Sequence, residues 1–214
     1  MFTRVYRTGM TSSNTISNSD EVVEEITYFD GLGRAKQSIG LRQSPTKKDI
    51  VTHYEYYAFG RQTKEYLPYV KATGNGAIAT GDIATATKSY YQTQYAADFD
   101  GVPLPNVNAY SEKVLENSPL NRVFEQAAPG KDWAKGDSYS SRGYTNESHS
   151  IKFEYDSNAA NEVKLFGVNT VLANNTYTPS LTGGTTYYVA GRLYKTITKD
   201  ENWEPTNGVN HTTE

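Results

Sequence analysis

The stretch Thr27-Tyr28-Phe29-Asp30-Gly31-Leu32-Gly33-Arg34-Ala35-Lys36-Gln37 decides the fold, because it joins two strand-like runs through a tight turn. The run 22–28 before the turn is rich in β-branched residues, and a second strand-like run, 35–39, follows it. At Gly33 the turn needs a positive φ, which glycine adopts without strain. A strand, a short turn and a second strand predict an antiparallel β-hairpin.

The same turn recurs at three later places in the chain. Each copy ends in a Gly-Arg or Asn-Arg pair, and asparagine is the residue that, after glycine, most readily adopts the left-handed conformation. We therefore expect positive φ at the first residue of every pair and a structural role for the arginine that follows. The four pairs are Gly33-Arg34, Gly60-Arg61, Asn121-Arg122 and Gly191-Arg192.

The spacing of these turns predicts a mainly β fold. Successive antiparallel hairpins should form one curved sheet, with one short helix and two long loops. We expect a single β-rich segment, 1–214, organised as follows: two regular hairpins at 22–69, an insertion with a short helix at 70–109, a degenerate hairpin at 110–127, a loop at 128–150, two further hairpins at 151–199 and the start of another repeat at 200–214.

Three local expectations concern the less regular parts. A helix should begin after Asp82, its N-cap, and run over 83–97, because Ile83, Thr87, Tyr91 and Tyr95 recur every four residues. The proline-containing run 101–108 should be extended. A hairpin without the Gly-Arg pair should cover 151–166 and turn through 156–161.

Composition excludes several classes of function. The 214 residues carry a net charge of −3, which argues against a nucleic-acid partner. No run of eighteen apolar residues is present, so the sequence predicts no membrane-spanning helix. Without cysteine the chain can form neither a thiolate metal site nor a disulfide. Eighteen tyrosines and seventeen glycines favour strands and turns.

Patterns typical of catalysis or cofactor binding are missing from the sequence. His53, His149 and His211 do not have the spacing of metal ligands. No nucleophile-elbow, Walker A or dinucleotide-binding motif occurs. We therefore expect no catalytic residue, no metal and no cofactor, and hence no enzyme. A general-base role for His53 is the alternative to an ordinary position on a strand.

Arginine and tyrosine are open to two interpretations. An arginine just after a hairpin tip can stack on a tyrosine of the neighbouring hairpin and bond to carbonyl groups there. Tyrosines can form cross-strand ladders, or they can line a surface that binds a carbohydrate or a protein. The candidate residues for such a binding surface are Trp133, Tyr139 and Tyr144.

Beyond the single turn, several ordered blocks resemble the amino-terminal region that precedes the repeat array of bacterial RHS proteins, whose repeats are called YD repeats. The proteins of this group are of the wall-associated or polymorphic-toxin type. This sequence differs from the repeat pattern at Tyr57, Tyr188 and Asn117-Ser118. The blocks that carry it are 27–37, 49–52, 60–69, 118–123 with 128–133, and 193–196 with 199–202.

The resemblance implies a non-enzymatic structural segment of a large secreted or surface protein. In this family the repeats form a β-shell that encloses or presents a C-terminal toxin or effector. The implied partners are downstream RHS repeats and the effector of the same polypeptide, with secretion machinery or cell-surface glycans as further partners. The alternative is a carbohydrate- or protein-binding β-module at the cell surface.

The carboxyl-terminal part of the chain leads to one more expectation. We expect a last hairpin at Thr185 to Thr198 with an unpaired edge, along which Tyr187, Val189, Leu193 and Ile197 are partly uncovered. Unpaired edges associate with other strands. The isolated chain should therefore self-associate at high concentration.

Overall fold

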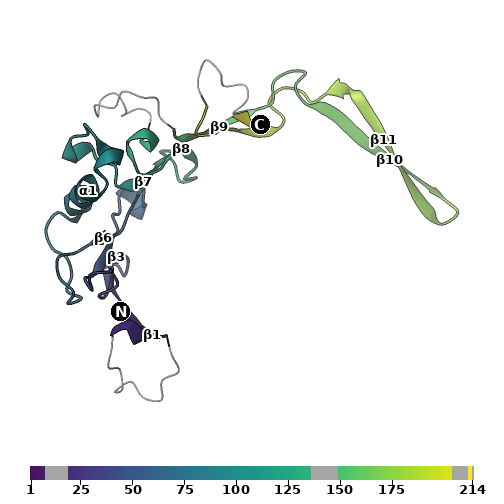
Figure 1. Cartoon of the computed structure of the whole chain (residues 1–214). Coiled ribbons are helices and arrows are strands. Elements are labelled where there is room, and N and C mark those ends of the chain that lie inside the picture. The colour runs from purple at the N-terminus through teal and green to yellow at the C-terminus, as the bar shows by residue number, and fades with distance from the viewer. Residues whose placement is uncertain (8–18, 136–148, 204–211, 214) are drawn as a thin grey trace. The chain divides into compact units, whose positions relative to one another are not determined.

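The computed structural model describes residues 1–7, 19–135, 149–203 and 212–213, and the chain divides into two compact units, Met1–Ser150 and Ile151–Glu214. Both units consist mainly of antiparallel strands (Figure 1). The predicted mainly β fold class is therefore confirmed. The strands form separate sheets, however, where the sequence predicted one continuous sheet.

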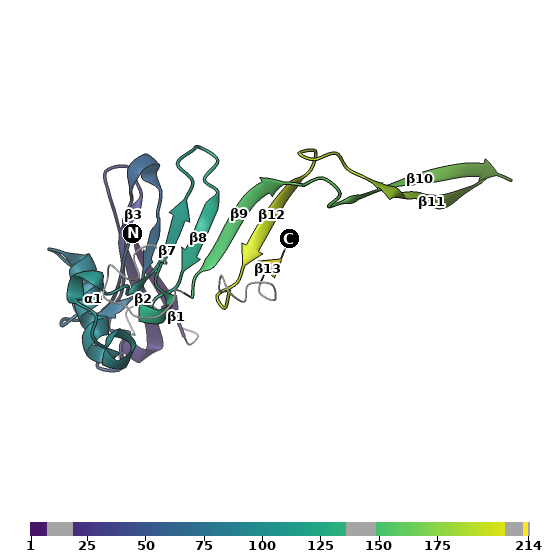
Figure 2. The same ribbon diagram turned by 90° about the horizontal axis from the view of Figure 1, so that it is seen from above.

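The first sheet has five strands in the order β1-β2-β3-β4-β6. Figure 2 shows its strands β1, β2 and β3 together with helix α1 (Ile83–Gln94). Its centre is the cross-strand pair Ile39 and Val51, whose side chains are fully buried. Ile83 of the helix packs against this pair, so the helix covers one face of the sheet. The strands are β1 (Phe2–Tyr6), β2 (Val22–Phe29), β3 (Ala35–Gly40), β4 (Ile50–His53) and β6 (Tyr69–Val70).

Helix α1 (Ile83–Gln94) begins where the sequence predicted it. The Asp82 carboxylate accepts a hydrogen bond from the Thr85 backbone N–H at 3.0 Å, which is the predicted N-cap. The helix ends at Gln94 rather than Ala97, and a 3₁₀ turn, η4 (Ala96–Phe99), follows. The prediction of the helix is confirmed up to this shift of its end.

The segment 101–108 is not fully extended, contrary to the prediction. It contains a 3₁₀ turn, η5 (Leu104–Asn106), closed by the Val107 N–H on the Leu104 carbonyl. Proline is compatible with the first turn of a helix because its fixed φ is already helical. The turn brings Val107 beside Phe99 in a second buried cluster. Further 3₁₀ turns are η2 (Ser19–Glu21), η3 (Ala58–Gly60) and η6 (Lys131–Trp133).

The first unit also contains the antiparallel strands β5 (Lys64–Tyr66), β7 (Tyr110–Leu115) and β8 (Val123–Ala127). The predicted hairpin around Gly60 is largely absent, since its two sides form no strand ladder and are joined by the isolated bridge Tyr54–Glu65 and by the turn itself. Strand β5 pairs instead with β7, which places Tyr66 opposite Tyr110. The second turn therefore carries the chain from one sheet to the next.

In the second unit, β9 (Ile151–Ser157) pairs with β12 (Tyr194–Lys199), which also pairs with β13 (Thr212–Thr213). The remaining strands, β10 (Lys164–Ala173) and β11 (Thr176–Tyr187), form a separate two-stranded hairpin. The predicted hairpins 151–166 and Thr185–Thr198 are thus both wrong. Their outer strands pair with each other, and the β10–β11 hairpin lies between them in the sequence. The predicted open edge of β12 is partly covered by β13.

Candidate functional site

The four turns that the sequence singled out share one backbone feature. The φ angle is 75° at Gly33, 68° at Gly60, 54° at Asn121 and 75° at Gly191. This left-handed conformation is strained for most residues other than glycine and asparagine. The predicted positive φ is therefore present at all four positions.

The first turn is closed by Asp30. Its backbone N–H donates to the Arg34 carbonyl at 2.8 Å, and its carbonyl accepts from the Gly33 N–H at 3.1 Å. Its carboxylate accepts from the backbone N–H groups of Leu32 and Arg34, and also from Arg34 Nε at 2.8 Å. The hydrogen bond from the Arg34 backbone N–H, followed by that from its side chain, lowers the pKa of Asp30.

The second turn keeps both backbone bonds, whereas the third keeps only that from the Asn121 N–H to the Ser118 carbonyl, and its Arg122 carbonyl accepts from Glu116. In the second turn Tyr57 takes the place of Asp30 and bonds to the Arg61 carbonyl and the Gly60 N–H. In the third turn the Ser118 hydroxyl accepts from the Leu120 N–H at 3.1 Å, as the Asp30 carboxylate does from Leu32. Serine therefore replaces the aspartate there, although the sequence alone indicated only a degenerate repeat.

The fourth turn is split between two distant segments. The Gly191 N–H donates to the carbonyl of Asn158, and the Asn158 side-chain oxygen accepts from the N–H groups of Arg192 and Leu193. Asn158 thus holds the place that Tyr188 was predicted to occupy. The sequence does not reveal this role, because the β10–β11 hairpin separates Asn158 from the Gly-Arg pair.

Arginines of the first two turns contact the turn that follows each of them. The Arg34 guanidinium lies 4.4 Å from the centre of the Tyr56 ring, next to the second turn. Arg61 Nη1 donates to the Glu116 carbonyl at 3.1 Å and to Asn121 Oδ1 at 3.0 Å, both in the third turn. These are the stacking and tip-bonding contacts that the sequence predicted for the arginines.

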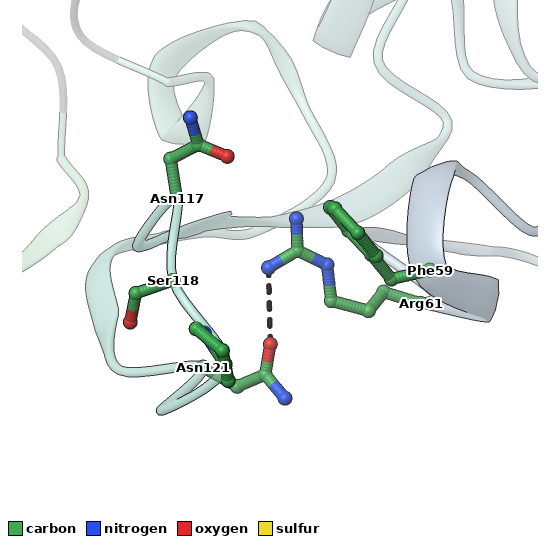
Figure 3. A pocket seen from close by; sticks show the side chains of 6 residues that line it. Phe59, Arg61, Asn117, Ser118 and Asn121 are labelled. Carbon is green, nitrogen blue, oxygen red and sulfur yellow. Dashed lines mark hydrogen bonds between the residues drawn. The ribbon is translucent and has the colours of Figure 1, made fainter.

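A pocket of about 330 Å³ lies between the second and third turns (Figure 3). The Arg61 guanidinium lies beside the ring of Phe59, which is 87% exposed and has a φ of 63°. Arg61 Nε is buried and has no hydrogen-bond partner among the described residues. Asn117, Ser118 and Asn121 supply polar groups on the other side. The pocket therefore combines an aromatic face with hydrogen-bonding groups.

The remaining two arginines bond to residues that flank or close their own turns. Arg122 forms two hydrogen bonds of 2.8 Å to the carboxylate of Glu116, on the opposite side of the third turn. The side-chain bond from Arg122 lowers the pKa of Glu116. Arg192 is fixed through its backbone N–H by Asn158. The Glu116–Arg122 pair was missed in the sequence, where the two residues lie at the two ends of the turn between β7 and β8.

A cluster around Glu55 was also missed. The Glu55 carboxylate accepts hydrogen bonds from the hydroxyls of Tyr57 and Tyr66, and His53 Nε2 lies 3.5 Å from it. Burial opposes the charge of Glu55, but the hydroxyl bonds and His53 leave its pKa lowered. Burial, with the nearby carboxylate, raises the pKa of both tyrosines, so they remain hydrogen-bond donors. His53 therefore lies in a fixed network next to a groove of about 400 Å³.

The predicted aromatic binding surface is described only in part. Trp133 is 43% exposed and its ring lies 5.5 Å from that of His149. Tyr139 and Tyr144 lie outside the described residues, as does His211. Elsewhere tyrosines pack against one another, as in the buried pair Tyr66–Tyr110, with ring centres 5.2 Å apart.

Two further observations concern ligands and membranes. Within the described ranges, no three histidine, aspartate or glutamate side chains are grouped so that they could hold a metal ion. The helices in those ranges are too short or too polar to cross a membrane.

Comparisons with known proteins add a family assignment. No curated protein and no solved structure matches the chain. Residues 2–146, about two thirds of the chain, match a family described as a domain of unknown function (DUF6443). The matched region contains the first three turns and the helix that covers the first sheet. The chain therefore belongs to the DUF6443 family.

Proposed function

We propose that this chain is a non-enzymatic structural segment of a large secreted or surface RHS-repeat protein. In this proposal its hairpin turns contribute to a β-shell that encloses or presents a C-terminal toxin or effector. The observation that carries the proposal is the bonding of Arg61 to the third turn, through Glu116 and Asn121. A side chain used in this way fixes one turn on the next.

The physical argument concerns the weakness of single hairpins. An isolated two-stranded hairpin is marginally stable in water, so successive hairpins must be joined to remain folded. Arg34 and Arg61 provide such joints at the tips, where no ladder hydrogen bonds are available. Repetition of one turn, with an arginine that contacts the following turn in two of the four copies, favours a structural role over catalysis.

The joint can be tested by replacing Arg61 with glutamine. Loss of a charge-assisted bond to a carbonyl and to Asn121 should destabilise the first unit by about 1–2 kcal/mol. Trp133 fluorescence in a Trp203→Phe background reports on this unit during denaturant unfolding. Arg7→Gln, at an exposed position, is the control and should change stability by less than about 0.5 kcal/mol. If Arg61→Gln and Arg7→Gln changed the stability equally, the contacts of Arg61 would not hold the two turns together, and the proposal would lose its main support.

The role in a larger protein can be tested in two ways, by the length of the reading frame and by assays of the purified chain for hydrolytic activity. The reading frame should continue after codon 214 into YD repeats and a C-terminal effector, and a stop codon there would contradict the proposal. The purified chain should hydrolyse no glycan, ester, peptide or nucleic acid. An activity that survived repurification and disappeared in His53→Ala or Glu55→Gln would show that the cluster around Glu55 is catalytic.

A binding module remains the second candidate, and the pocket of Figure 3 favours it. An exposed aromatic ring beside an arginine and three polar side chains is suited to a sugar ring. Binding of a glycan on an array, lost in Phe59→Ala and retained in Leu32→Ala, would support this candidate. Leu32 is a fair control because it is a similarly exposed apolar residue at the first turn.

A further inference from the structure

The β10–β11 hairpin has a fixed register. Asn174 and Asn175 form its loop, and both have positive φ, 50° and 57°. A two-residue loop of this kind is a type I′ turn, which makes the flanking residues Ala173 and Thr176 a hydrogen-bonded pair. Pairs alternate from there, so Thr170 and Pro179 form a non-hydrogen-bonded pair. Proline fits this place because its nitrogen points away from the ladder.

One face of this hairpin is apolar and exposed. Side chains alternate along a strand, so cross-strand pairs two residues apart share a face. The exposed fractions are 66% for Val168, 72% for Leu181, 56% for Leu172 and 68% for Tyr177. We call the following three pairs the apolar face: Val168–Leu181, Thr170–Pro179 and Leu172–Tyr177.

The opposite face is mostly polar. It carries the pairs Gly167–Thr182, Asn169–Ser180 and Val171–Thr178. Within the described residues neither strand pairs with any strand outside the hairpin. An isolated amphipathic hairpin gains stability when its apolar side chains leave water. The asymmetry of the two faces therefore indicates the side on which a partner would bind.

The charge of the segment restricts that partner. The 27 residues from Leu165 to Gly191 include no aspartate, glutamate, lysine, arginine or histidine. A charged partner such as a nucleic acid or an anionic lipid surface would find no complement there. The partner surface should be equally uncharged and apolar. The same face of a second copy of this chain meets that requirement.

The order of side chains along the face is also compatible with self-association. Bulky pairs lie on both sides of the smaller central pair, Thr170–Pro179. A two-fold axis near this central pair would place Val168 and Leu181 of one copy over Leu172 and Tyr177 of the other. Such a contact uses the same surface on both subunits and closes on itself.

We propose that two copies of this protein associate by packing the apolar faces of their β10–β11 hairpins against each other. The three pairs span five residues of each strand, so the contact covers roughly 170 Å² of flat sheet per copy. This is well below the ~800 Å² per partner of a standard stable interface. The dimer should therefore be weak and depend on protein concentration. The contact goes beyond the proposed function and does not rest on it.

Sedimentation of the whole chain over roughly a hundredfold range of concentration tests the proposal. The double variant Val168→Thr/Leu181→Thr changes the apolar face and should raise the dissociation constant by at least about tenfold. Val171→Thr makes the same kind of change on the opposite face, where Val171 is 54% exposed. It should change the constant by less than about twofold. Circular dichroism checks that each variant keeps its strands.

Cross-linking tests the geometry independently. The chain has no cysteine, so a single introduced thiol can be addressed alone. Thr170→Cys lies near the proposed axis and should be joined to its counterpart by a short bismaleimide. Asn169→Cys, on the opposite face, should not be joined.

Each alternative outcome overturns the proposal. A chain that stays monomeric at the highest concentration has no such interface. Equal effects of the double variant and Val171→Thr would show that the apolar face is not the contact. Equal cross-linking at positions 169 and 170, or growth into fibres, would indicate pairing along a strand edge instead.

Discussion

The first and fourth turns are closed by nearly the same hydrogen bonds, although one is continuous and the other is split. Asp30 and Gly33 are three residues apart, whereas Asn158 and Gly191 are separated by the whole β10–β11 hairpin. In both turns a glycine N–H meets the acceptor's carbonyl, and the next N–H meets its side chain. The turn is therefore defined by its bonds in space and tolerates a long insertion.

The two turns differ in the nature of the acceptor. Asp30 is charged and partly exposed, and it also forms an ion pair with Arg34. Asn158 is neutral and only 2% exposed. The buried amide should contribute more to stability, because its removal leaves a cavity and two partly buried backbone N–H groups without their acceptor. The following variants test this contrast, in order of decreasing effect.

The largest effect is expected from Asn158→Ala. The N–H groups of Arg192 and Leu193 lose their acceptor in a partly buried place, which should destabilise the second unit by roughly 2 kcal/mol. Trp203 fluorescence in a Trp133→Phe background reports on this unit, since Lys199 Nζ of β12 lies 4.3 Å from the Trp203 ring.

Two further variants make this test specific. Asn158→Asp keeps the oxygen that accepts both backbone bonds and should recover much of the loss. Asn169→Ala changes an exposed asparagine of β10 and should cost less than about 0.5 kcal/mol. Equal stability of Asn158→Ala and the wild type would mean that the split turn is held by other contacts.

The second-largest effect is expected from removing the segment between Asn158 and Gly191, and this change should increase the stability. Replacement of residues 159–190 by Gly-Leu joins Asn158 to Gly191 as Asp30 is joined to Gly33. Shortening the connection lowers the entropy lost on closing the turn, so the pairing of β9 and β12 should gain up to about 2 kcal/mol. Loss of the cooperative Trp203 transition would show instead that the hairpin supports this unit.

The sequence predicted the parts of the fold that depend on local signals. Positive φ at Gly33, the cap at Asp82 and the start of the helix follow from neighbouring residues. Strand pairing after Gly60 and around Gly191 could not be predicted, because it depends on distant partners. Asn158 bonds to a distant segment and Glu116 pairs with Arg122 across a turn, so no pattern of adjacent residues indicates them.

Strain at the glycines should be of equal size in both turns. Gly33 and Gly191 have the same φ of 75°, and in both cases a Cβ atom would meet open space. Gly33→Val and Gly191→Val should therefore each cost about 1–2 kcal/mol, the first followed with Trp133 and the second with Trp203. Gly31→Val is the control, because Gly31 has open space without a positive φ. If Gly191→Val left the stability of the second unit unchanged, the first and fourth turns would not be equivalent.

The smallest effect is expected from Asp30→Asn, which gives the first turn the acceptor of the fourth. The pKa of Asp30 is lowered by the Arg34 backbone N–H and then by its side chain, so the folded state prefers the carboxylate. Its stabilisation is present above the unfolded pKa, near 4, and is lost as pH falls through the lower folded pKa. Asparagine keeps the backbone bonds and cannot titrate, so Asp30→Asn should change the stability little at pH 7. It should also flatten the acid dependence of the unfolding transition followed with Trp133.

The Trp203 transition, whose turn is closed by the neutral Asn158, is the internal control and should keep its pH profile. An unchanged acid dependence of the Trp133 transition would show that the charge of Asp30 contributes nothing to the continuous turn.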